Sequence, residues 1–228
     1  MKIAIISPWT VSDTAVGGTE RFVIDLAESL KNLGNEIDVY MLSGKSYSKK
    51  EVNYININIL GRDGYIEEKT LISMYGDFSK VESYIKLANL LEELINVDDY
   101  DLIQLNSQLF LKAFKNKKRI FTIHTNPFEF CQGFGEKAFE TMIRLIKDEK
   151  DNSTYFVTPS QFYKKNYEKL TGLYINFIPH AINVNRIKKD INTDEICNKY
   201  KINKELKHIL LPSRLEPVQK RPMLFMKA

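Results

Sequence analysis

Side chains that could bind or transform a substrate come directly after short apolar runs of this 228-residue sequence. They are Gly17, Gly18, Thr19 and Glu20, then Asn106, then His124, Thr125 and Asn126, then Ser160, and finally Arg214 and Lys220. Short continuous apolar runs are typical of strands that are buried in a parallel sheet. Because ligands bind beyond the carboxyl ends of such strands, we expect these side chains to gather at one edge of a sheet.

The glycine pair Gly17–Gly18 opens a stretch with helical spacing and has two interpretations. At the N-terminus of a helix, its exposed amides would favour an anion such as phosphate. Most glycine pairs only serve a tight turn, and the sequence contains neither G-x-G-x-x-G nor G-x-x-x-x-G-K-[ST]. His124 could be a histidine whose bonds are satisfied at a strand end, but its place at the expected ligand edge favours a function.

Three other features have structural interpretations beside the functional ones. Ser160 is better suited to cap the helix after it than to act as a nucleophile, because no G-x-S-x-G elbow surrounds it. Asp99 and Asp101 resemble a D-x-D metal pair, but they precede a predicted strand, so we predict a turn and no metal there. Arg214 and Lys220 form either a solvated basic loop or a clamp on a diphosphate.

Alternating strands and helices must position these side chains. The predicted strands are Lys2–Ile6, Glu36–Leu42, Tyr54–Ile59, Asp101–Leu105, Arg119–Ile123, Tyr155–Thr158, Ile175–Pro179 and His208–Ser213. The strict alternation of Tyr54–Ile59 places that strand near an edge of the sheet. Helical spacing predicts helices over 78–96, 136–150 and 160–171.

A first helix follows the glycine pair. Apolar residues share one face of it: Phe22, Val23, Leu26, Ala27, Leu30 and Leu33. We expect Thr19 to cap this helix, Glu20 to sit favourably in its first turn and Gly34 to end it.

The alternation predicts an α/β fold with a Rossmann-like, doubly wound and mostly parallel sheet. Residues 1–182 should form this domain, and 183–205 a polar linker with a short helix. Residues 206–228 hold a lone strand and a helix start, which cannot bury their own apolar face. They therefore either pack back on the first domain or begin a second, Rossmann-like domain, and the second interpretation is the one we adopt.

Composition narrows the classes of protein. The net charge of +4 comes from 33 basic and 29 acidic residues, a balance too even to argue for nucleic-acid binding. The apolar run at the start of the chain is too short for a signal peptide. No stretch approaches the ~20 consecutive apolar residues that a membrane span needs. Cys131 and Cys197 are too far apart for a metal or redox motif. We expect a cytoplasmic protein, and peripheral contact with the inner face of the membrane stays open.

The ordered series of motifs resembles the N-terminal, acceptor-side half of a retaining glycosyltransferase of the family-four type, which has the two-Rossmann-domain (GT-B) architecture. The matching stretches are GGTERFVIDLAESLKNLGNEIDVY, YDLIQLNS, IFTIHTNP, FVTPSQFYKKNY, INFIPHAIN and LLPSRLEPVQKRP. They resemble that family's Gly-Gly-x-Glu-Arg loop, its two strands that end in histidine, its strand–Ser–helix unit, its Pro-Asn-Gly turn and its Gly-Arg-Leu…Lys-Gly signature. The resemblance spans essentially the whole chain.

The resemblance implies transfer of a sugar from a nucleotide-diphosphate donor to a sugar-containing acceptor, with retention and without a metal or other cofactor. The implied catalytic residues are His124, Arg214 and Lys220. The implied donor contacts are Gly17, Gly18, Arg214 and Lys220. The implied acceptor side consists of Thr19, Glu20, Asn106, Thr125, Asn126 and Ser160. Fixed cations would stabilise the charge that builds on the leaving diphosphate.

Several positions depart from the family pattern. Asn106 stands where many members have histidine, His180–Ala181 replaces Asn-Gly, Asn183 replaces Asp, and Ser213 replaces Gly. The Glu-(seven residues)-Glu segment that holds the donor lies past residue 228, so we expect this chain alone to be inactive. Three alternatives stay open: a subunit completed in trans by a donor-binding chain, a non-catalytic binding domain, and a sugar-nucleotide epimerase of the same architecture.

Overall fold

The computed structural model describes residues 1–8, 11, 17–42, 44–57, 79–149, 153–181, 192–209 and 226. The chain divides into two compact units, Met1–Ile182 and Asn183–Ala228. The candidate site lies in the first unit. The second unit contains helix α7, Thr193–Tyr200, whose first turn is capped by the side chain of Asn192.

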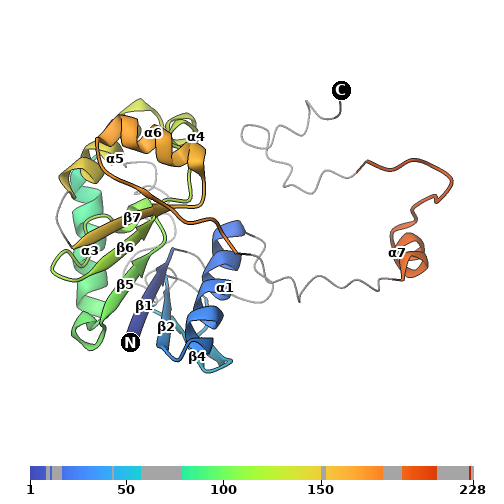
Figure 1. The fold of residues 1–228 in the computed structure, drawn as a ribbon, viewed down its shortest axis with the longest axis horizontal. Coiled ribbons are helices and arrows are strands. Elements are labelled where there is room, and N and C mark those ends of the chain that lie inside the picture. Colours follow the sequence, from blue (N-terminus) through green and yellow to red (C-terminus); the bar gives the residue numbers. More distant parts are fainter. Residues whose placement is uncertain are drawn as a thin grey trace. The chain divides into compact units, whose positions relative to one another are not determined.

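The described residues of the first unit form one eight-stranded sheet with the order β3-β4-β2-β1-β5-β6-β7-β8. Its strands are β1 Lys2–Ser7, β2 Glu36–Met41, β3 Tyr47–Lys49, β4 Val52–Asn56, β5 Leu102–Leu105, β6 Arg119–Thr122, β7 Thr154–Thr158 and β8 Asn176–Phe177. Neighbouring strands run parallel except β3 and β4, which are antiparallel. The mostly parallel, doubly wound sheet predicted from the sequence is confirmed (Figure 1).

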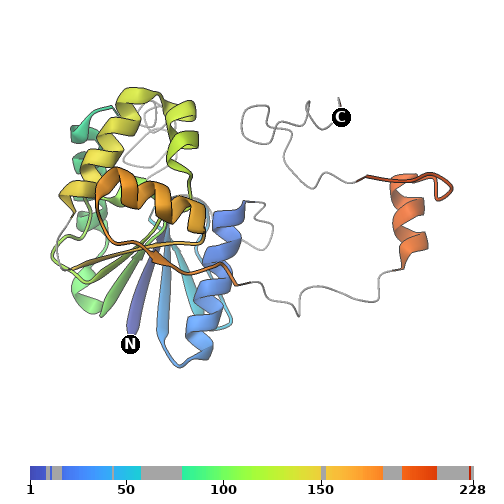
Figure 2. The same cartoon turned by 45° about the horizontal axis from the view of Figure 1, so that its top comes forward.

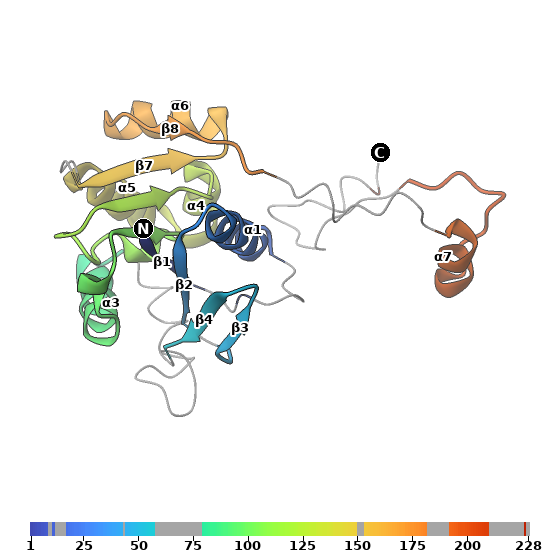
Figure 3. The same ribbon diagram turned by 60° about the horizontal axis from the view of Figure 1, so that its bottom comes forward.

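Helices cover both faces of this sheet. They are α1 Gly18–Asn32, α3 Val81–Leu94, α4 Pro127–Phe134, α5 Glu136–Asp148 and α6 Gln161–Thr171, with short 3₁₀ turns η1 Val97–Asp99 and η2 Gln108–Phe110. Figure 3 shows α1 and α3 on opposite sides of the sheet. Helices α4, α5 and α6 pack side by side (Figure 2).

Two hydrophobic clusters follow from this layering. On one face, α1 buries Val23, Ile24 and Ala27 against β1, β2 and β4. Positions 23, 24 and 27 share one side of a helix, so their spacing explains which face of α1 is buried. On the other face, α3, α5 and α6 enclose the larger cluster, which includes Phe110, Phe121 and Tyr167. The sheet is therefore held from both sides, and its carboxyl edge is fixed relative to α1.

The sequence predicted most of these elements, and three differ. Strand β3 and helix α4 were not predicted. The Thr19 cap was wrong, because Gly17 in extended backbone (φ −85°, ψ 148°) is the N-cap and α1 begins at Gly18, two residues earlier than a Thr19 cap implies. Gly34 does end the helix: its φ of 84° suits glycine, and its N–H donates to the Lys31 carbonyl at 2.9 Å. Most of the predicted strand His208–Ser213 lies outside the described residues.

Candidate functional site

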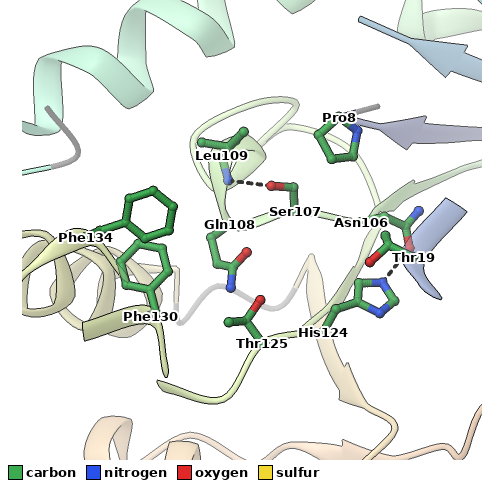
Figure 4. A pocket seen from close by; sticks show the side chains of 10 residues that line it. All are labelled: Pro8, Thr19, Asn106, Ser107, Gln108, Leu109, His124, Thr125, Phe130 and Phe134. Carbon is green, nitrogen blue, oxygen red and sulfur yellow. Dashed lines mark hydrogen bonds between the residues drawn. The ribbon is translucent and has the colours of Figure 1, made fainter. Parts of the chain in front are cut away.

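A pocket of about 170 Å³ opens at the carboxyl edge of the sheet (Figure 4). Its walls come from five elements that are far apart in the sequence. The lining residues are Pro8, Thr19, Asn106, Ser107, Gln108, Leu109, His124, Thr125, Phe130 and Phe134. Pro8 follows β1, Thr19 lies in the first turn of α1, and the others follow β5 or β6 or belong to α4. The parallel strands thus bring together Thr19, Asn106, His124 and Thr125, as the sequence predicted.

His124 occupies the end of β6 and is held by Asn106 at the end of β5. The distance from His124 Nε2 to Asn106 Oδ1 is 3.2 Å. Asn106 in turn donates to the Ile6 carbonyl of β1, from its backbone N–H at 3.2 Å and from Nδ2 at 3.4 Å. Asn106 is only 2% exposed. Its side chain therefore connects three strand ends.

A second pair of buried polar residues, Gln104 and Thr122, lies two residues earlier on the same two strands. Gln104 Nε2 donates to Thr122 Oγ1 at 2.5 Å and lies 3.5 Å from Asn106 Oδ1. Gln104 and Thr122 are 5% and 4% exposed. Buried polar groups lose stability unless they are hydrogen-bonded, and here each one faces a partner on the neighbouring strand.

Two aromatic rings enclose His124. The Phe22 ring of α1 meets it edge-on with centroids 5.1 Å apart, and His180 lies 5.2 Å away. Phe22 and His180 are themselves stacked at 4.2 Å. Burial lowers the pKa of His124 to about 3, and the nearby His180 adds to this effect. Desolvation also lowers the pKa of His180. His124 is therefore neutral at physiological pH.

The loop after β6 is pinned from both sides. The Ile123 N–H donates to the Val157 carbonyl at 2.8 Å, and Thr158 Oγ1 donates to the Ile123 carbonyl at 3.1 Å. Beyond His124, the buried Tyr167 hydroxyl of α6 donates to the Thr125 carbonyl at 3.2 Å. His124 thus sits on a rigid segment, which suits a residue that must hold a fixed geometry.

Helix α4 supplies the apolar wall that the sequence reading missed. Asn126 caps it through Oδ1, which accepts from the Phe128 N–H at 3.1 Å, and Pro127 follows at the first helical position. Asn followed by Pro is a helix-start signal that could have revealed this helix. Phe130 and Phe134, with ring centroids 4.8 Å apart, face the polar wall across the pocket (Figure 4).

Gly17 and Gly18, at the N-terminus of α1, differ in how much space surrounds them. A Cβ on Gly17 would lie 1.9 Å from Glu20 Oε2, so the Glu20 carboxylate folds back over Gly17. A Cβ on Gly18 would have no atom of the described residues within 4 Å. Gly17 has no side chain to cap the first-turn amides, which carry the positive end of the helix dipole. The open space therefore lies at Gly18.

The remaining predicted residues fall in different places. Ser160 caps α6, since its Oγ accepts from the Tyr163 N–H at 3.3 Å, and it does not line the pocket. Asp99 belongs to the turn η1, and Asp101 Oδ2 accepts from the Lys2 N–H at 2.8 Å, so the predicted turn is confirmed. Arg214 and Lys220 lie outside the described residues.

The described part of the chain holds no group of three or more His, Cys, Asp or Glu side chains placed to bind a metal ion. Judged by length and apolarity, none of its helices could cross a bilayer.

Comparison with known proteins identifies related chains. The family model of Glycosyltransferase Family 4 matches residues 16–186. A stretch of 64 residues is 39% identical to the alpha-1,3/1,6-mannosyltransferase ALG2 of Yarrowia lipolytica, and covers 27% of this chain and 13% of that protein.

Solved structures share the fold. Sucrose-phosphate synthase from Thermosynechococcus elongatus matches 89% of this chain and 53% of its own, with a TM-score of 0.62 and 18% identity. WaaG, a glycosyltransferase involved in lipopolysaccharide biosynthesis, matches 89% and 52%, with a TM-score of 0.58 and 12% identity. Anabaena HepE, solved with UDP and glucose, matches 88% and 50%, with a TM-score of 0.57 and 14% identity. The chain spans about half the length of these structures.

Proposed function

The chain belongs to Glycosyltransferase Family 4, and on this premise we propose that it forms the acceptor side of an enzyme that moves a sugar from a nucleotide-diphosphate donor to a sugar-containing acceptor. The family and the GT-B-type, Rossmann-like fold bear out the resemblance seen in the motifs. Retention of the anomeric configuration and independence from metal are further parts of this proposal.

One observation carries the proposal: a pocket with one polar and one aromatic wall opens beside the N-terminus of α1. The polar wall offers hydrogen-bonding groups from Thr19, His124 and Thr125. The opposite wall offers the rings of Phe130 and Phe134. A sugar ring presents hydroxyl groups around its edge and C–H bonds on its faces, so a site with these two walls suits it.

The donor phosphates are assigned to the N-terminus of α1. Its first-turn amides attract anions, and Gly18 leaves room for a phosphate to approach the backbone. Glu20 covers Gly17, so Gly18 is the better candidate for the direct contact. Anabaena HepE, which shares the fold, was solved with UDP and glucose, and this supports a nucleotide-sugar donor. We assign Arg214 and Lys220 to the leaving diphosphate, where two cations would do the work that a metal does elsewhere.

His124 contributes polarity to this site rather than proton transfer. A histidine with a pKa of about 3 is a weak base. At physiological pH almost none of it is protonated, so it cannot act as a general acid either. Its neutral ring can still exchange hydrogen bonds with a substrate hydroxyl. We therefore place it beside the transferred sugar as an orienting group.

The proposal requires a second half. This chain covers only about half of each matched structure, so we infer that most donor contacts come from another domain, in the same polypeptide or in trans. We expect the 228-residue chain alone to show little donor binding or transfer. Turnover by the isolated chain would contradict this division of the site.

Product analysis tests the proposed reaction. The complete polypeptide would be incubated with UDP- and GDP-linked sugars and with saccharide and glycolipid acceptors, with a chelator present. We expect a sugar joined to the acceptor with the donor's anomeric configuration, and loss of transfer when Arg214 and Lys220 are both replaced by alanine. An inverted product would refute retention. An epimerised donor with no acceptor product would assign the chain to the epimerase alternative instead.

A further inference from the structure

The orientation of the Asn106 amide is set by its neighbours. Its backbone N–H and its Nδ2 both donate to the Ile6 carbonyl, which has no hydrogen to offer in return. On the other side, Gln104 Nε2 lies 3.5 Å from Asn106 Oδ1. Turning the amide over would bring Oδ1 against the Ile6 oxygen and Nδ2 against the Gln104 amide. Both contacts favour the arrangement in which Oδ1 faces His124.

This orientation determines which nitrogen of His124 carries its proton. Asn106 Oδ1 can only accept a hydrogen bond, so the 3.2 Å contact requires a proton on His124 Nε2. A neutral imidazole has one N–H, which leaves Nδ1 as an acceptor. Among the described residues, none hydrogen-bonds Nδ1. Figure 4 shows that second nitrogen on the side of the ring away from Asn106.

The surroundings hold the ring in this state. Phe22 and His180 pack against it, and the segment that carries it is tied to β7 and α6. The buried Gln104–Thr122 bond fixes Gln104 below Asn106 and so keeps the amide from turning. The Asn106 side chain is thus itself fixed, and it orients His124.

We propose that Asn106 is a positioning residue that fixes His124 as its Nε2–H tautomer, so that Nδ1 accepts a hydrogen bond from a hydroxyl group of the bound sugar. The part about the sugar rests on the proposed function. The part about the tautomer does not, because it concerns the chain without substrate.

Nuclear magnetic resonance tests the tautomer directly. The sequence has three histidines, so His180→Gln and His208→Gln variants of the ¹⁵N-labelled full chain assign the His124 signals. At neutral pH we expect the ¹⁵N–¹H couplings of the His124 ring to be typical of a protonated Nε2 and an unprotonated Nδ1. A protonated Nδ1 in the wild-type chain would overturn the proposal, whatever reaction the protein catalyses.

Kinetics test the consequence for the sugar. We expect Asn106→Leu to lower kcat about tenfold, the effect of one hydrogen bond, with little change in the acceptor KM. Asn106→Asp keeps an oxygen acceptor for Nε2–H and should retain more activity than Asn106→Leu. Asn35→Leu is the matched control, since Asn35 Nδ2 also donates to a backbone carbonyl, that of Leu30, at 2.9 Å.

The outcomes separate the two claims. An Nε2–H tautomer in the wild type with unchanged kcat in a folded Asn106→Leu variant would refute the role toward the sugar and keep the tautomer. Equal impairment of the Asp and Leu variants would show that the acceptor oxygen is not what matters. Failure to detect any transfer by the complete wild-type polypeptide would count against the proposed function and leave the resonance result standing.

Discussion

His124 combines a buried ring, a hydrogen bond with Asn106 and ring contacts with Phe22 and His180. These features disfavour the imidazolium form, and they explain why its pKa falls to about 3. The chemistry that remains for such a residue is hydrogen bonding to an uncharged group. A sugar hydroxyl meets that description better than a phosphate does.

This neutrality should appear in the pH dependence of stability. Between the unfolded pKa of 6.5 and the folded value of about 3, the unfolded chain binds a proton at His124 that the folded chain does not. Stability from this residue is therefore complete above pH 6.5 and is lost as the pH falls below it. Lowering the pH from 7 to 5 should cost the wild type about 2 kcal/mol more than a His124→Phe variant, measured by urea unfolding. Equal losses in the two proteins would contradict the buried, neutral histidine.

The sequence could predict where these residues gather, but not which side chains contact one another there. A histidine directly after a strand is expected at the ligand-binding edge of an α/β sheet. The sequence cannot show that Asn106 faces His124, because those residues meet only through the pairing of β5 with β6. The Thr19 cap failed for a local reason. Gly17 can cap in extended backbone, which starts α1 earlier and leaves Thr19 to line the pocket.

At the scale of elements, α4 supplies the aromatic wall of the pocket. It was missed because its eight residues, PFEFCQGF, contain Pro and Gly and lack a clear periodicity. Strand β3 was missed because three residues give too short a pattern to recognise, although Tyr47 stacks on Tyr54 with centroids 4.4 Å apart. The longer strands and helices were predictable because their apolar periodicity extends over several residues.

The aromatic wall of α4 should select the acceptor. Phe134 lines the pocket and is 43% exposed, whereas Phe128 on the same helix is 50% exposed and does not line it. Phe134→Ala should raise the acceptor KM several-fold, because an aromatic contact contributes about 0.5–1.5 kcal/mol, and should leave the donor KM unchanged. Phe128→Ala is the matched control. An equal effect of the two substitutions would remove the case for this wall as an acceptor contact.

The opposite edge of the sheet is held by a buried ion-pair network. Glu149 contacts Arg119 at 2.7 Å, Lys115 at 2.7 Å and Lys112 at 3.1 Å, and its side chain is fully buried. Arg119 begins β6, the strand that ends next to His124. This network therefore anchors the strand that carries the site.

Removing the charge of Glu149 should destabilise the fold strongly. Glu149→Gln leaves Arg119 buried without its carboxylate, which typically costs about 3–5 kcal/mol. Glu51→Gln is the control, since Glu51 pairs with Lys31 but its side chain is 82% exposed, and the expected loss is at most about 1 kcal/mol. The midpoints of urea unfolding measure both. Similar losses for the two variants would show that the buried network is not what anchors β6.

At the scale of the whole molecule, the described residues of the first unit form one sheet with a pocket at its carboxyl edge. The family model spans 16–186, most of that unit. The order of strands and helices was predictable because each strand–helix repeat has a recognisable apolar pattern in its own local sequence. The proposed donor contacts of Arg214 and Lys220 stay a prediction, because both residues lie outside the described residues.

The central claim is that sugar transfer takes place in the pocket beside His124. The most direct measurement is the rate of transfer from a nucleotide-sugar to acceptor by the complete polypeptide, compared between the wild type, His124→Ala and the remote control Asn35→Ala. The account predicts that His124→Ala lowers kcat/KM at least about tenfold, through the loss of one or more hydrogen bonds, while Asn35→Ala stays near wild type. Wild-type transfer by a folded His124→Ala variant would contradict the account and place the reaction elsewhere.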